Sequence, residues 1–112
     1  MKLENKKLEE YQSICDEVCE TYQKLESKKW VPEGFELAMK EFRDKSVELR
    51  NGIEKVNSDS KLKENIIEVE QAADTVMKIA KGHQEVPEDF QSQVIKVHDK
   101  VHHFKKSVLT IE

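Results

Sequence analysis

The five residues VPEGF at positions 31–35 return 55 residues later as VPEDF at positions 86–90. Proline has a fixed φ and no backbone N–H, so it suits the first turn of a helix. The acidic residue behind it lies well against the positive end of the helix dipole. Each copy is therefore predicted to be a turn that leads into a helix, and its recurrence predicts a duplicated helical hairpin.

The apolar residues that follow each turn recur at alternating steps of four and three. This spacing is typical of an amphipathic helix that packs in a bundle. Only Ser46 interrupts the first series, and nothing interrupts the second. The two series are Phe35, Met39, Phe42, Leu49, Ile53 and Val56, followed by Phe90, Val94, Val97, Val101, Phe104, Val108 and Ile111.

The segments before the two turns show the same spacing and are also predicted to be helices. Their apolar residues are Tyr11, Ile14, Val18 and Leu25, and then Leu62, Ile66, Val69, Ala73, Val76 and Ala80. The second helix has a possible earlier end at Asn51-Gly52, which is disfavoured because Ile53 and Val56 keep its phase. The helices are predicted over approximately 4–27, 33–56, 60–81 and 88–111. The predicted fold class is all-α: one domain, 1–112, forming an antiparallel up-down-up-down four-helix bundle built from a duplicated helical hairpin with a repeat offset of 55.

The composition of the 112 residues agrees with this fold class. Glycine (3) and proline (2) are scarce, and charged residues (38%) balance hydrophobic ones (37%), as in solvated helices with one apolar face each. The net charge of −4 is spread along the chain, so no basic arm for nucleic acid is present. No apolar run is long enough to cross a membrane or to act as a secretory signal. We therefore expect a cytoplasmic protein without a nucleic-acid or membrane partner.

The sequence offers no constellation of residues for catalysis. It contains no glycine-rich phosphate loop, no nucleophile in a known motif and no Glu-x-x-His pair of the di-iron bundles. The predicted inward positions are nearly all aliphatic or aromatic. The main exception is Ser46, whose hydroxyl is expected to bond the backbone carbonyl one turn back. A non-enzymatic protein is predicted.

Two pairs of side chains suggest an alternative function, a metal- or ligand-binding bundle. Cys15 and Cys19 are four residues apart on the first predicted helix, and His98 and His102 are four apart on the fourth. Antiparallel neighbours would place the pairs at similar height, and two thiolates with two imidazoles suit tetrahedral zinc. The other interpretation makes the cysteines small hydrophobes beside the core and the histidines half-buried hydrogen-bonding groups. No other cofactor is expected.

A second row of side chains lies beside the predicted core of the fourth helix. It either widens the buried stripe or forms a docking face for a partner helix or a second copy of the chain. The candidate docking residues are Ile95, His98, His102 and Leu109, with Ile67 and Met77 in the same relation to the third helix. The predicted function is an interaction module that binds a protein partner, of adaptor, inhibitor, immunity or secretion-partner type, as a monomer or homodimer.

Overall fold

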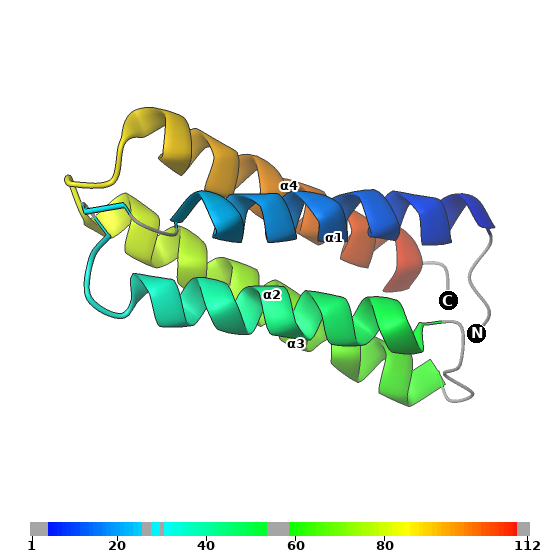
Figure 1. Cartoon of the computed structure of the whole chain (residues 1–112). Helices are drawn as coiled ribbons and strands as arrows, with labels where there is room; N and C mark the ends of the chain where they lie inside the picture. Colours follow the sequence, from blue (N-terminus) through cyan, green and yellow to red (C-terminus); the bar gives the residue numbers. More distant parts are fainter. Residues whose placement is uncertain (1–4, 26–27, 30, 54–58, 110–112) are drawn as a thin grey trace.

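The computed structural model describes residues 5–25, 28–29, 31–53 and 59–109, with only the backbone at 59, 60 and 109. These residues form four helices and no strand (Figure 1). The helices are α1 (Asn5–Leu25), α2 (Phe35–Gly52), α3 (Asp59–Gly82) and α4 (Glu88–Leu109). The predicted all-α four-helix bundle is confirmed. None of these helices, over the residues described, has an apolar stretch that could cross a membrane.

Each helix packs against two others. Helices α1 and α3 both contact α2 and α4, and the chain reverses direction at each connection (Figure 1). Side-chain contacts give the register of α1 against α4: Lys7 Nζ donates to Ser107 Oγ at 2.9 Å, and Lys100 Nζ donates to Glu17 Oε1 at 2.7 Å. The start of α1 therefore lies beside the end of α4. The duplication of the hairpin stays a prediction.

The two copies of the repeated turn start their helices differently. Helix α4 begins at Glu88, directly after its proline, whereas α2 begins at Phe35, two residues later in the motif. Gly34 has a φ of +84°, which glycine tolerates because it has no Cβ. The second copy has Asp89 at this position, inside the helix. The glycine thus accounts for the later start of α2.

Both turns place their phenylalanine in the core at the same end of the bundle. The rings of Phe35 and Phe90 meet edge to face, with their centroids 6.0 Å apart. Edge-to-face geometry is favourable for aromatic pairs. The repeated motif therefore contributes a matched contact between the two hairpins as well as two helix starts.

Helix α2 ends at Gly52, at the earlier break that the prediction of a helix over 33–56 disfavoured. Ile53 lies in a turn with φ −61° and ψ −34°, and residues 54–58 lie outside the described residues. Glycine is a poor helix former, because fixing its backbone costs more conformational entropy than for other residues. This cost favours an end here over continuation in phase toward Val56.

The core follows the predicted apolar series closely. Every predicted inward residue whose side chain the structure describes is buried except Ile53, which is partly buried. Val56 and Ile111 lie outside the described residues. Tyr11 of α1 contacts both α4 and α2. The centroid of its ring lies 5.2 Å from that of Phe104 on α4, and its hydroxyl donates to the backbone carbonyl of Ser46 on α2 at 2.8 Å. Burial raises the pKa of Tyr11, so this phenol stays protonated and can donate.

The two buried hydroxyls of the core differ in their bonding. Thr21 Oγ1 donates to the Glu17 carbonyl one turn back at 2.7 Å. The same bond was expected for Ser46, but its Oγ is buried and has no hydrogen-bond partner among the described residues. The bonded backbone carbonyl of Ser46, and not its hydroxyl, is the polar link to α1.

Candidate functional site

The predicted docking histidines of α4 face carboxylates of α3. His98 Nε2 lies 2.5 Å from Asp74 Oδ1, and its Nδ1 lies 3.3 Å from Asp99 Oδ1. Only 14% of the His98 side chain is exposed. One turn along, His102 Nδ1 lies 2.9 Å from Glu70 Oε2. The two imidazole rings are nearly parallel, with centroids 6.4 Å apart. The histidines therefore link α4 to α3 at two successive turns.

Glu70 is the most enclosed carboxylate of this group, with 12% of its side chain exposed. Besides His102, it accepts a hydrogen bond from Lys105 Nζ at 2.7 Å. Burial raises the pKa of Glu70, but the hydrogen bonds from Lys105 and His102 outweigh that effect and lower it below its ordinary value. The carboxylate is therefore charged at neutral pH and holds the two helices together through both oxygens.

We call these side chains the acid–histidine ladder: Asp74, His98, Glu70, His102 and Lys105. Apolar residues flank it at both ends. Met77 and Ile95 lie one helical turn beyond Asp74 and His98 and are partly buried, and Ile67 lies one turn before Glu70 with 38% of its surface exposed. The α3/α4 face is thus apolar at its ends and ionisable in its middle. The side chain of Leu109 lies outside the described residues.

The ladder carboxylates and Lys105 were missed in the sequence. A signal was available, because Glu70 and Asp74 are four residues apart on one helix and His98 and His102 are four apart on another. Residues at this spacing share a helix face. Pairing them required knowing that these two faces of α3 and α4 meet.

The structure does not bring the cysteine pair to the histidine pair. Cys15 is fully buried and Cys19 partly buried. Burial and the nearby Cys19 raise the pKa of Cys15 to about 11, against the opposing charge of Arg50 on α2. The histidines instead contact the carboxylates of Asp74 and Glu70 on α3. Among the residues that the structure describes, no three His, Cys, Asp or Glu side chains could hold a metal ion. The proposed four-residue zinc cluster is therefore not assembled.

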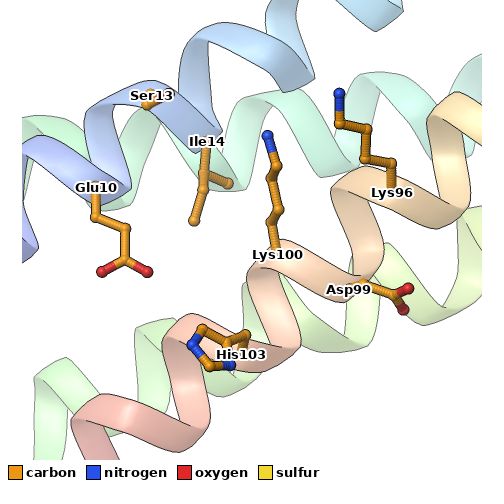
Figure 2. Close-up of a pocket in the computed structure, with 7 residues that line it drawn as sticks. All are labelled: Glu10, Ser13, Ile14, Lys96, Asp99, Lys100 and His103. Atoms are coloured by element: carbon orange, nitrogen blue, oxygen red, sulfur yellow. The ribbon is translucent and has the colours of Figure 1, made fainter.

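A cleft of about 470 Å³ lies on the other side of α4, against α1. Its lining residues are Glu10, Ser13 and Ile14 from α1 and Lys96, Asp99, Lys100 and His103 from α4 (Figure 2). Figure 2 shows Ile14 and Lys100 extending toward each other across the space between the two helices. Lys100 Nζ bonds both oxygens of Glu17, at 2.7 and 2.9 Å. The sequence pattern indicated neither the cleft nor its lining.

The α1/α4 cleft and the α3/α4 face occupy two sides of one helix. Both carry charged and hydrogen-bonding side chains; the apolar residues of the α3/α4 face are partly exposed, whereas Ile14 of the cleft is buried. Comparison with protein-family models, curated proteins and solved structures found no match to this chain.

Proposed function

We propose that this chain is a non-enzymatic, cytoplasmic helical-bundle module that binds a protein partner through its α3/α4 face. The observation that supports this best is the exposure of Ile67, with 38% of its surface in contact with solvent. The buried stripe of α3 is complete without it, because its neighbours Ile66 and Val69 are 1% and 2% exposed. Covering exposed apolar surface of this kind with a partner removes it from water and so favours association.

The ladder suits the centre of a recognition surface. Glu70 is bonded through both oxygens and His98 through both ring nitrogens, so these side chains are held in place before a partner arrives. Ordering side chains in advance reduces the entropy cost of association. Charged groups between apolar ones also favour partners with complementary charges. A partner surface with apolar groups at both ends and polar groups between them fits this face.

The polar groups in the core support a non-enzymatic role. Thr21 bonds a backbone carbonyl, and the Ser46 hydroxyl has no base beside it among the described residues. Activation of a nucleophile requires a base within hydrogen-bond reach. The proposal therefore assigns these hydroxyls to the packed interior.

The double variant Ile67→Lys, Ile95→Lys tests this function. A capture experiment from the native cell extract, followed by reconstitution with the purified partner, measures binding. We expect binding to be lost in the double variant while helical content and Tm are retained, because both residues are at least partly exposed. Sedimentation of the purified chain applies the same test to a homodimer.

Leu37→Lys is the matched control, because Leu37 lies on α2 with 61% of its surface exposed. It should bind the partner like the wild type. Full binding by the double variant would exclude the α3/α4 face, and loss of binding in Leu37→Lys alone would move the interface to α2. An unfolded double variant would show that the two isoleucines belong to the core.

A further inference from the structure

The lining of the α1/α4 cleft combines one apolar residue with six polar or charged ones. The apolar residue, Ile14 of α1, is 3% exposed, and the charged side chains of α4 lie on the opposite side of the cleft (Figure 2). Small-molecule sites are concave, of roughly 300 to 1,000 Å³, and mostly apolar, with a few polar groups that orient the ligand. The volume of the cleft, about 470 Å³, falls in this range, and its lining is richer in polar groups.

Most charges around the cleft already have a partner. Glu10 accepts from Lys7 at 3.2 Å, and Asp99 lies 3.3 Å from His98 Nδ1. Lys100 is bound to Glu17. The carboxylates of the cleft are thus each compensated by a basic group outside it.

Three polar groups of the lining remain without a partner among the described residues: Lys96, Ser13 and His103. A lysine ammonium and a serine hydroxyl donate hydrogen bonds, and an imidazole donates from at least one nitrogen. The unengaged groups of the cleft therefore match a ligand that accepts hydrogen bonds and has a negative charge. Lys96 and His103 are seven residues apart on α4, which corresponds to about 10.5 Å along the helix axis.

We propose that the α1/α4 cleft binds an organic anion whose apolar body lies on Ile14 and whose carboxylate or phosphate head group accepts hydrogen bonds from Lys96. Ser13 and His103 donate to polar groups elsewhere on the ligand. This site lies on the α1 side of α4 and shares none of the ladder side chains, and its one contact with the ladder is that of Asp99 with His98.

Titration of the ¹⁵N-labelled chain with octanoate and with octyl phosphate tests the site by amide chemical shifts. We expect saturable shifts centred on Ser13, Ile14, Lys96 and Lys100, weakened by added salt because exposed charges are screened. Binding of only one of the two probes identifies the preferred head group. Uncharged 1-octanol should bind at least several-fold more weakly. Equal binding of octanol would overturn recognition of the anion, and shifts that spread over all four helices without saturation would overturn the site.

Lys96→Gln is the decisive variant, and Lys40→Gln on α2 is its matched control, since both lysines are exposed. Lys96→Gln should weaken octanoate binding several-fold, with helical content and Tm unchanged, and Lys40→Gln should leave binding intact. Equal affinities of the two variants would refute the role of Lys96. Ser13→Trp, which fills the cleft from an exposed position on α1, should abolish binding; undiminished binding would place the ligand elsewhere.

Discussion

Helix α4 packs differently against its two neighbours. Toward α3 it lies close over more of its length than it does toward α1. The buried positions of α3 include Ala73 and Ala80, whereas those of α1 include Tyr11 and Tyr22. The distance between packed helices depends on the size of the side chains between them. On the α1 side, the Tyr11 ring lies between the helices and packs against Phe104.

Similar side chains on the two sides of α4 differ in their contacts. His102 and His103 are adjacent on α4, yet His102 bonds Glu70 of α3, whereas His103 lines the cleft and has no partner among the described residues. On the α3 side, the ionisable side chains of α4 bond carboxylates of α3. The α1/α4 side also has such bonds, from Lys100 to Glu17 and from Lys7 to Ser107. It nevertheless leaves Lys96 and His103 of the cleft without a partner among the described residues.

Truncating Phe104, which packs between α4 and α1, should have the largest effect on stability. Phe104 is 1% exposed and packs against Tyr11. Phe104→Ala should lower the free energy of unfolding by about 3 to 5 kcal/mol, because it leaves a cavity in the core. Denaturant titration measures the change. The neighbouring, exposed His103→Ala should alter stability by less than about 0.5 kcal/mol. Similar losses in the two variants would contradict the assignment of Phe104 to the core.

Enlarging one small residue on α3 and one on α1 compares how much space each helix leaves for a larger side chain. Ala73 of α3 is buried in the core, and Ser13 of α1 lies at the cleft. Ala73→Leu should cost about 1 to 3 kcal/mol through overpacking, whereas Ser13→Leu should change stability by no more than about 0.5 kcal/mol. The two Tm values provide the measurement. If Ser13→Leu is the more damaging, the α1/α4 seam is the tighter one and the comparison fails.

Breaking the ladder should have the smallest effect. Glu70→Gln keeps the shape of the side chain but removes the charge that Lys105 and His102 bond, and it should cost about 1 kcal/mol or less at neutral pH because both partners are partly exposed. Since the pKa of Glu70 is lowered in the folded state, its contribution is fully present above the ordinary glutamate pKa of about 4.3. It disappears as the pH falls through the lowered value.

Stability curves of the wild type and Glu70→Gln should therefore converge on acidification. Glu64→Gln, an exposed change on the same helix, is the control and should follow the wild type at every pH. A difference between Glu70→Gln and the wild type that stays constant from neutral to strongly acidic pH would show that the Glu70 charge does not link α3 to α4.

The sequence by itself determined the four helices, the residues that form the core and the two turns. Apolar residues at steps of four and three must face one side of a helix, and proline is tolerated in the first turn of a helix but not in its interior, whatever the neighbours are. Gly34 in place of Asp89 was a visible local signal for the later start of α2, although the prediction treated both copies alike.

Only the tertiary structure decided which side chains meet across the helices. The pairing of His98 with Asp74, the unbonded hydroxyl of Ser46, the separation of Cys15 from His98 and the cleft beside Ile14 all depend on which helix faces meet and at what distance. Periodicity determines the direction in which a residue points. The distance to the next helix depends on the side chains of both helices, so it does not follow from the periodicity of either one.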